Sequence, residues 1–267
     1  DGVGFDPGYR EERFPAHLLG KLRFIRDFYS EDYVDYDPEF VCCKMTLEHI
    51  ERPGDFVGMV NRAVAGSEHP TIFFQIPEAL RILNGCAFED IYYEHCSYFT
   101  PGSLARLFRR AGFRVADLDT EYDDQYLTIE AEPGEDTGVP FDREESVAEL
   151  EERVRTFSDR TAEAHREWKR LVGDSVAAGK KVVLWGSGSK AVSFITTLGF
   201  RDEIEAAVDI NPYRQGHYMP TSAHRIVGPD ELQDIRPDVV IIMNRVYRDE
   251  IASQLDSLGL APEIHAL

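Results

Sequence analysis

The stretch KVVLWGSGSKAVSFITTLGF, from Lys181 to Phe200, decides the fold class. An apolar run of strand length, Lys181–Trp185, is followed at once by a glycine turn and then by a segment of helical length. Strand, glycine turn and helix in this order begin an α/β unit built on a parallel sheet. Two later apolar runs, Glu205–Asp209 and Asp238–Met243, supply further strands. We therefore predict a small α/β domain at the C-terminal end of the chain.

The glycine turn of this unit predicts a ligand crevice. Its sequence, Gly186-Ser187-Gly188-Ser189-Lys190, has two of the three glycines of a dinucleotide-binding turn, with Ala191 in the third place. Amides at such a turn suit phosphate, and the pattern favours phosphate over NAD in particular. The residues expected along the crevice at the strand ends are Gly186, Ser187, Gly188, Lys190, Asp209, Asn211, Gln215 and Asn244. The alternative is a nucleotide fold that keeps only a structural role.

Upstream of this unit, residues 142–178 predict one long helix with a narrow apolar seam. Roughly 35 residues at 1.5 Å each give a rod of about 50 Å, long enough to connect two domains. The seam steps by three and four residues through Val147, Leu150, Val154, Phe157, Thr161, Ala164, Trp168 and Leu171. The alternative is the stem of a coiled-coil dimer.

The first half of the chain predicts a second α/β domain. Phe40–Cys43 is expected to be a buried strand, and Thr71–Gln75 another. A helix is expected from Thr100 to Gly112, with Thr100 as N-cap, Pro101 in the first turn and Gly112 as C′. The runs FRVADLDT and QYLTIEAEP then follow closely enough to form an antiparallel pair. The expected division is 1–137, 138–178 for the connecting helix, and 179–267.

Between the second of these strands and the helix lies IYYEHCSYF, residues Ile91–Phe99. It places tyrosines, a glutamate, a histidine and a thiol next to each other on a loop carried by a sheet. We interpret this loop as the reaction centre. The alternative is a polar turn whose tyrosines cap the edge of a core, and Cys96 as a nucleophile is a further, weaker alternative.

Composition narrows the class of protein. Of the 267 residues, 49 are acidic and 29 are basic, which gives a net charge of −20. Nucleic acid is therefore not an expected partner, because its binding needs clustered Lys and Arg. No apolar run approaches the ~20 residues that cross a bilayer, and no signal peptide opens the sequence, so a cytoplasmic protein is expected. The four cysteines form no C-x-x-C pair, and no metal site is predicted.

The opening GVGFDPGY, Gly2–Tyr9, reads as the end of a parallel strand with Asp6 at its carboxyl end. An acid at this place in a Rossmann-like sheet commonly hydrogen-bonds a ribose diol. A turn-forming Asp-Pro is the alternative interpretation.

Three stretches together resemble the sugar C-methyltransferase family, whose members use S-adenosylmethionine on nucleotide-linked keto-sugars. The first is FVCCKMTLEHIERPGDFV, similar to the motif that follows the fourth strand of class I methyltransferases. The second is FEDIYYEHCSYFTPGSLARLFRRAGFRV, which matches the family's central loop. The third is the C-terminal unit, with its glycine turn, VDINPYRQGHYMP and PDVVIIMN.

This resemblance implies a class I methyltransferase-type doubly wound sheet, without its first strand, followed by a Rossmann-like domain. The family's zinc domain and first glycine loop are not in this sequence, so the chain resembles a family member entered midway, at its second strand. Either the protein continues upstream of Asp1 or part of the cofactor site is missing. The resemblance implies S-adenosylmethionine as cofactor, with Asp6 at its ribose and Glu48 in the phrase beside its pocket. The C-terminal crevice is implied to help hold the nucleotide-sugar.

The same resemblance gives the expected catalytic roles. His95 is expected to act as base, because a histidine is largely neutral at pH 7. Glu94 would support His95, and Tyr92 would act as oxyanion donor or alternative base. His49 is the second histidine near the substrate, or alternatively a polar residue before a helix.

Three functions remain open from the sequence. The first is C-methylation of a nucleotide-linked keto-deoxysugar or a related small molecule through an enolate. The second is a non-catalytic nucleotide-sugar binding protein with a degenerate methyltransferase half. The third is an NAD-dependent oxidoreductase built on Gly186–Gly188, although the Tyr-Glu-His cluster lies in the other half of the chain.

Overall fold

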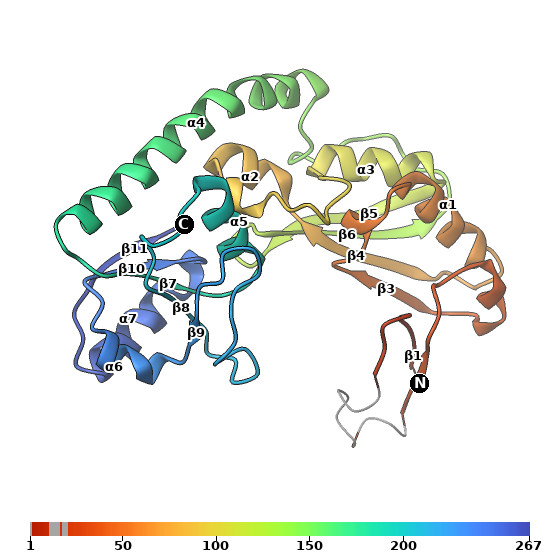
Figure 1. Cartoon of the computed structure of the whole chain (residues 1–267). Coiled ribbons are helices and arrows are strands. Elements are labelled where there is room, and N and C mark those ends of the chain that lie inside the picture. The colour runs from red at the N-terminus through yellow and green to blue at the C-terminus, as the bar shows by residue number, and fades with distance from the viewer. Residues whose placement is uncertain (1, 11–16, 18–20) are drawn as a thin grey trace. The chain divides into compact units, whose positions relative to one another are not determined.

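The computed structural model describes residues 2–10, 17 and 21–267, and the chain falls into two compact units (Figure 1). The first unit comprises Asp1–Pro77, Phe99–Glu121 and Tyr126–Glu144. The second unit comprises Glu78–Tyr98, Tyr122–Gln125 and Glu145–Leu267. Two short segments of the first half thus pack with the C-terminal part, whereas the three-part division expected from the sequence stays a prediction.

The first unit is a mixed α/β structure. Its strands are β1 (Gly2–Phe5), β2 (Leu22–Ile25), β3 (Phe40–Lys44), β4 (Thr71–Pro77), β5 (Phe113–Glu121) and β6 (Tyr126–Pro133). Its helices are α1 (Pro53–Ala63) and α3 (Pro101–Arg110), with 3₁₀ helices η3 (Glu31–Tyr36) and η4 (Leu47–His49). Strands β1 and β2 pair in parallel as a sheet of their own, and the other four form a sheet in the order β3-β4-β6-β5.

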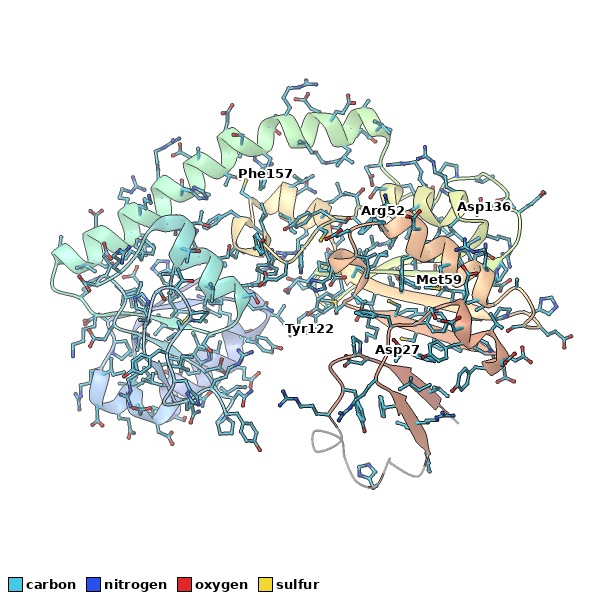
Figure 2. All side chains as sticks on the ribbon, turned by 45° about the vertical axis from the view of Figure 1, so that its right-hand side comes forward. Asp27, Arg52, Met59, Tyr122, Asp136 and Phe157 are labelled. Atoms are coloured by element: carbon cyan, nitrogen blue, oxygen red, sulfur yellow. The ribbon has the colours of Figure 1, made fainter. Side chains whose placement is uncertain are left out.

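The core of the first unit lies on one face of the four-stranded sheet. In β4, Ile72, Phe74 and Ile76 alternate as fully buried residues, as a strand with period two requires. Helices α1 and α3 supply the facing side chains, including Val57 and Phe108, and Met59 of α1 packs against the same cluster (Figure 2). The antiparallel pairing of β5 with β6 is confirmed.

Strand β3 differs from its prediction. We expected a buried strand, yet Phe40 is 56% exposed and Cys42 is exposed as well. Among the described residues β3 pairs only with β4, so it is an edge strand with one side uncovered. An apolar run alone does not distinguish an edge strand from a central strand.

The ends of α3 agree with the sequence prediction. Thr100 is the N-cap in a reciprocal capping box with Ser103, and Pro101 opens the first turn. Gly112 follows the last turn with φ +87°, the left-handed conformation that favours glycine at C′.

The second unit is a parallel sheet covered on both faces. Its strands are β7 (Val182–Trp185), β8 (Ala206–Val208), β9 (Ile226–Val227), β10 (Val239–Ile242) and β11 (Glu263–Ala266), in the order β11-β10-β7-β8-β9. Its helices are α2 (Ala79–Gly85), α4 (Val147–Ala177), α5 (Ser189–Leu198), α6 (Leu232–Ile235) and α7 (Arg248–Ser257), with 3₁₀ helices η5 (Phe88–Asp90), η6 (Pro229–Glu231) and η7 (Arg245–Tyr247). Every strand pair in this sheet is parallel.

Two apolar clusters cover the two faces of this sheet. One joins Leu184 and Ile241 to Phe194 of α5, Val172 of α4 and Phe88 of η5. The other joins different residues of the same strands to α6 and α7. The order of strands reverses between β7 and β10, which is the place where doubly wound sheets bind ligands. The predicted long helix is present as α4, while α2, β9 and β11 were not predicted.

No helix in the described part of the chain is long and apolar enough to cross a bilayer.

Candidate functional site

The predicted reaction loop lies in the second unit, after α2 and η5. The amide of His95 donates to the carbonyl of Tyr92, which closes the loop into a turn. The rings of Tyr92 and His95 meet edge to face with centroids 4.8 Å apart, and the ring of Tyr98 lies 5.8 Å from that of His95. The structure therefore brings Tyr92 and His95 together, whereas Glu94 is exposed.

The hydroxyl of Tyr92 is engaged by a neighbouring acid. It donates a hydrogen bond of 2.8 Å to the carboxylate of Asp90. Burial raises the pKa of Tyr92 far above its ordinary value, and the negative charge of Asp90 adds to the rise. The phenol therefore keeps its proton near neutral pH, which suits a hydrogen-bond donor better than a base.

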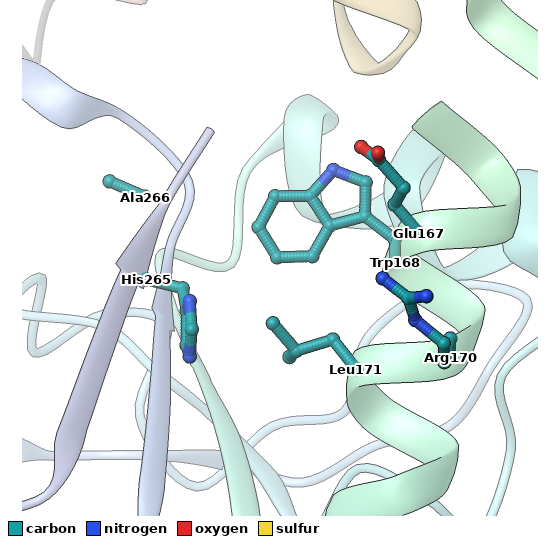
Figure 3. Close-up of a pocket in the computed structure, with 6 residues that line it drawn as sticks. All are labelled: Glu167, Trp168, Arg170, Leu171, His265 and Ala266. Atoms are coloured by element: carbon teal, nitrogen blue, oxygen red, sulfur yellow. The ribbon is translucent and has the colours of Figure 1, made fainter. Parts of the chain in front are cut away.

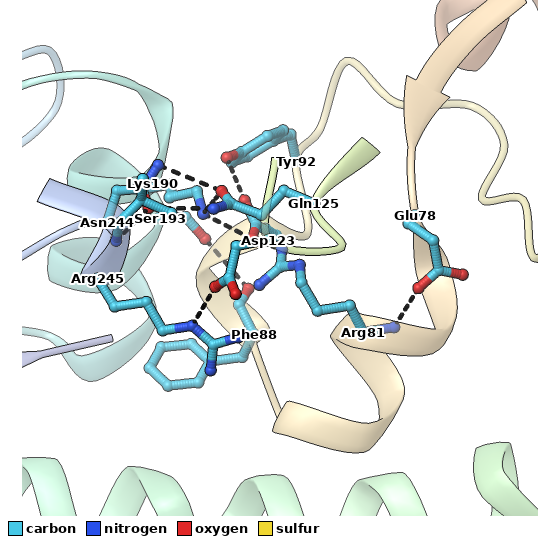
Figure 4. A network of polar contacts seen from close by, with 12 residues as sticks. Glu78, Arg81, Phe88, Tyr92, Asp123, Gln125, Lys190, Ser193, Asn244 and Arg245 are labelled. Atoms are coloured by element: carbon cyan, nitrogen blue, oxygen red, sulfur yellow. Dashed lines mark hydrogen bonds and ion pairs between the residues drawn. The ribbon is translucent and has the colours of Figure 1, made fainter. Parts of the chain in front are cut away.

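Asp90 binds three side chains of a polar network, those of Arg81, Tyr92 and Lys190, and Figure 4 shows these three partners. Its side chain pairs with Arg81 of α2 and, at 2.9 Å, with Lys190 of α5. Burial alone would raise the pKa of Asp90, but Lys190 and Arg81 outweigh it and lower the pKa below the ordinary value. Asp90 is thus a buried carboxylate that stays ionised between two cations.

The next acid along η5 behaves differently. Glu89 is only 3% exposed, and burial raises its pKa to about 7, with a further contribution from Asp90. The two adjacent carboxyl groups therefore differ in pKa: that of Glu89 is raised and that of Asp90 is lowered, because Arg81 and Lys190 pair with Asp90.

A cavity of about 280 Å³ opens beside this network within the second unit. Gln125 and Asn244 line it and exchange two hydrogen bonds, of 3.1 and 3.2 Å. Lys190 also donates to Gln125, at 3.3 Å, and Arg245 pairs with Asp123 at 2.7 Å (Figure 4). The cavity therefore combines amide groups, cations and the buried acid Glu89 at the carboxyl ends of β7 and β10.

The other predicted crevice residues form a separate group around Asp209. Its carboxylate accepts hydrogen bonds from the hydroxyl and the amide of Ser187 and pairs with Arg214 at 3.1 Å. It also accepts from the amide of Asn211, while Gln215 donates to the carbonyl of Asp209 at 2.9 Å. Of the glycine turn, the amide and hydroxyl of Ser187 are therefore directed to the protein itself.

Gly186 serves the close packing of the turn. It has φ +117°, and a Cβ placed there would lie 3.1 Å from the Cβ of Met243. Gly188 is the N-cap of α5 and needs no left-handed backbone. The glycine pattern is thus explained in part by the packing of β7 against the segment after β10.

The remaining predicted site residues lie in the first unit. Asp6 follows β1, is exposed, and accepts the amide of Gly8 at 2.7 Å. Glu48 and His49 lie in η4, beyond the end of β3, with His49 Nε2 3.9 Å from Glu48 Oε1. Glu48 is 2% exposed, and burial raises its pKa.

A second cavity of about 550 Å³ lies between α4 and β11 (Figure 3). Trp168 and Leu171 of α4 face His265 and Ala266 across it. Trp168 and Ala266 also line the smaller cavity, so the two cavities share a wall. Neither residue was predicted to line a site.

Sequence reasoning missed Arg81, Asp90, Glu89 and Gln125. Arg81 and Asp90 are nine residues apart, and Lys190 is one hundred residues further on, so no local spacing signals their contact. The only available signal was the pair of acids directly before the loop, Glu89-Asp90, which stands in an otherwise apolar phrase.

Comparison with known protein families matches both parts of the chain. Residues 2–118 match a methyltransferase domain, and residues 140–260 match the C-terminal domain of C-methyltransferases. The chain belongs to the C-methyltransferase family.

A curated member of this family is similar to the chain. The C-methyltransferase NovU of Streptomyces niveus is 30% identical over 192 residues, which cover 67% of this chain and 45% of NovU. The chain thus spans about half the length of that relative.

Solved structures of methyltransferases are similar to this chain over about half of its length. One is the 1,6-didemethyltoxoflavin-N1-methyltransferase of Burkholderia thailandensis, 15% identical, covering 50% of this chain and 61% of that chain with a TM-score of 0.37. Another is a SAM-dependent methyltransferase of Archaeoglobus fulgidus, also 15% identical, covering 49% of this chain and 75% of that chain with a TM-score of 0.35.

Proposed function

We propose that the protein is an S-adenosylmethionine-dependent methyltransferase that acts on a carbon of a nucleotide-linked keto-deoxysugar or a related small molecule. The observation that carries this proposal is the contact between Tyr92 and His95, at 4.8 Å between ring centroids. The chain around it matches a methyltransferase domain and the C-terminal domain of C-methyltransferases. A carbon next to a ketone carries a weakly acidic hydrogen, so its methylation requires a base and a donor for the enolate oxygen.

His95 is the proposed base. It takes the proton from the carbon beside the carbonyl, and the electrons of that C–H bond move to the carbonyl oxygen as an enolate. The enolate carbon would then receive the methyl group, while the sulfonium sulfur of the cofactor would keep the electron pair of the broken S–C bond and leave as a neutral thioether. Glu94, the residue before His95 in the loop, is proposed to assist the proton transfer, and His49 is proposed as a second polar group at the substrate.

Tyr92 is the proposed donor to the enolate oxygen. Its raised pKa keeps the hydroxyl protonated, so the role of alternative base is not proposed. In the structure this proton is directed to Asp90, and Tyr92 would share it with the substrate oxygen as negative charge develops there.

The cofactor proposal rests on residues of the first unit. Asp6, exposed at the carboxyl end of β1, would accept hydrogen bonds from a ribose diol. The rings of Tyr29 and Tyr33 surround Phe5, directly before Asp6, and offer an aromatic surface to an adenine ring. Glu48, buried beyond β3, is proposed to lie beside the cofactor as well. S-adenosylmethionine, when bound, supplies the electrophilic methyl group.

The nucleotide part of the substrate is proposed to bind to the second unit, at the 280 Å³ cavity lined by Gln125, Asn244 and Arg245. Amide side chains can read the hydrogen-bonding edge of a base, and a partly exposed arginine suits a phosphate group. This assignment keeps Asn244 of the predicted crevice as a substrate contact and leaves Lys190 in the cavity wall, bound to Asp90 and Gln125 of the chain itself. The residues around Asp209 have a supporting role.

The test is methyl transfer from labelled S-adenosylmethionine to thymidine-diphosphate-linked and other nucleotide-linked 4-keto-sugars by the full-length protein. We expect His95→Ala to lower the rate about 10²- to 10⁴-fold, the usual contribution of a general base. The matched control is His265→Ala, on the edge strand β11, which should leave the rate unchanged. Tight binding of nucleotide-sugar without any methyl transfer would instead identify a non-catalytic binding protein.

A further inference from the structure

The start of α5 is where a sheet of this kind offers a site for an anion. The strand order reverses between β7 and β10, and α5 begins directly after β7 and its glycine turn. The first turn of a helix carries a partial positive charge, and here it also carries Lys190. In a nucleotide-binding protein, this combination of groups faces a phosphate.

In this protein the anion that Lys190 binds is Asp90. The ammonium group of Lys190 lies 2.9 Å from the carboxylate, and Asp90 is only 7% exposed. Arg81 pairs with the same carboxylate from α2. At the glycine turn itself, the amide and hydroxyl of Ser187 are bound to Asp209. Lys190 and Ser187, two groups that would face a phosphate, are thus directed to carboxylates of the chain.

The segment that carries Asp90 is also fixed to α5 by other contacts. The hydroxyl of Ser193 lies within 3.4 Å of the carbonyl of Phe88 and 3.3 Å of the carbonyl of Ile91 (Figure 4). The ring of Phe88 is 5% exposed and stacks on Phe194 at 6.1 Å. Polar and apolar contacts therefore hold η5 on the same helix.

We infer that Asp90 is a positioning residue, which Lys190 and Arg81 hold so that it orients Tyr92 and, through it, His95. The start of α5 then serves to place the reaction loop and does not bind the phosphate of a nucleotide. This inference deepens the proposed function and rests on it for the roles of Tyr92 and His95, whereas the docking of η5 on α5 is independent of those roles.

The path from Lys190 to His95 consists of direct contacts. Lys190 binds Asp90, Asp90 accepts the hydroxyl of Tyr92 at 2.8 Å, and the ring of Tyr92 meets that of His95. The amide of Tyr92 is fixed in addition by the hydroxyl of Tyr98, at 2.9 Å. Removing the cation leaves the buried carboxylate with one partner fewer, which loosens its hold on Tyr92.

The first experiment does not depend on methyl transfer. Hydrogen exchange of residues 88–98 is compared in the full-length protein, in Lys190→Met and in Asp90→Asn, with Lys180→Met as control. Lys180 is a lysine of the same unit that forms a surface ion pair with Glu263, at 3.2 Å. We expect exchange in this segment to become about tenfold faster or more in the first two variants and to stay unchanged in the control. Unchanged exchange in Lys190→Met would overturn the inference.

A titration with inorganic pyrophosphate separates the two uses of the helix start. We expect that Lys190→Met binds pyrophosphate no more weakly than the wild type does, because the ammonium group of Lys190 is already paired with Asp90. If the wild type binds pyrophosphate and Lys190→Met does not, the helix start is a phosphate site and the inference is wrong.

The kinetic test applies once methyl transfer has been measured. Lys190→Met should lower kcat about tenfold or more with little change in KM for the keto-sugar, because loop geometry changes and substrate contacts do not. Lys190→Arg should recover most of kcat. A variant that raises KM alone would instead place Lys190 at the substrate. If the wild type transfers no methyl group but the exchange results hold, the proposed function fails and the docking of η5 stands.

Discussion

The side-chain amides of Gln125 and Asn244 bind each other by two hydrogen bonds, 119 residues apart in the sequence. The pair joins the tip of the β5–β6 hairpin to the end of β10 inside the second unit. Each side-chain amide also accepts a further hydrogen bond, Gln125 from Lys190 and Asn244 from the backbone amide of Val246.

This pair gives a prediction for stability. Gln125→Ala and Asn244→Ala should each destabilise the protein, and the double variant should lose less than the sum, with a coupling free energy of about 1 kcal/mol. Urea unfolding of the four proteins of the cycle measures this. A coupling of zero would mean that the two amides do not bind each other in solution.

A second prediction concerns Glu89 and pH. Its pKa rises from the ordinary 4.5 in the unfolded chain to about 7 in the folded protein. Between these values the folded state binds the proton and the unfolded state releases it, so stability falls as pH rises through this window. The total loss is about 3 kcal/mol at 1.36 kcal/mol per pKa unit.

The variant Glu89→Gln keeps the shape of the neutral acid and removes this titration. Its Tm relative to the wild type should therefore increase between pH 5 and pH 8, where the wild type becomes charged. Thermal unfolding across that range measures the difference. The control is Glu151→Gln, which makes the same substitution at an exposed glutamate of α4. A difference in Tm that does not depend on pH would show that Glu89 has an ordinary pKa.

A third prediction concerns Tyr92. Tyr92→Phe removes the hydroxyl that binds Asp90 and, in the proposed reaction, the donor to the enolate. We expect kcat to fall about 10²-fold, the effect of losing one donor at an oxyanion, with a smaller effect on KM. Tyr93→Phe, in which the altered ring is fully exposed, is the matched control and should retain full activity. If Tyr92→Phe and Tyr93→Phe have the same kcat, the hydroxyl of Tyr92 has no role in the reaction.

A fourth prediction concerns the end of α3. Gly112 has φ +87°, and a Cβ there would lie 2.7 Å from Nδ2 of Asn61, whose amide binds the carbonyl of Ala111. Gly112→Ala should cost about 1–2 kcal/mol, because it strains the backbone and displaces Asn61. Gly173→Ala in α4 has open space and a helical backbone, so it should stabilise the protein by about 0.5–1 kcal/mol. Chemical unfolding of both variants tests the contrast.

Features that depend on neighbouring residues could be predicted from the sequence. The capping of α3 follows from Thr100, Pro101 and Gly112, each of which has a local preference for its position. The strand–turn–helix of β7 and α5 follows from an apolar run that ends at two glycines. Helix α2 was missed because it is short and is capped by Glu78, which is not among the favoured N-cap residues.

Features that depend on distant residues could not be predicted. The exposure of Phe40 depends on the absence of a second neighbour for β3 among the described strands, which an apolar run does not reveal. Likewise, the contact of Asp90 with Lys190 crosses one hundred residues, and its two partners have no common motif. The sequence predicted Tyr92 and His95 as neighbours because they are three residues apart, but not the carboxylate that holds Tyr92.

The assembly of the second unit from three separate stretches of chain has a consequence for protein engineering. A chimera that exchanges only residues 145–267 between relatives would carry Lys190 and Phe194 into a chain whose own residues replace Asp90 and Phe88. To transfer a substrate preference by domain exchange, residues 78–98 and 122–125 must therefore be exchanged together with the C-terminal part. The natural unit of exchange is defined by contacts in space and is discontinuous along the gene.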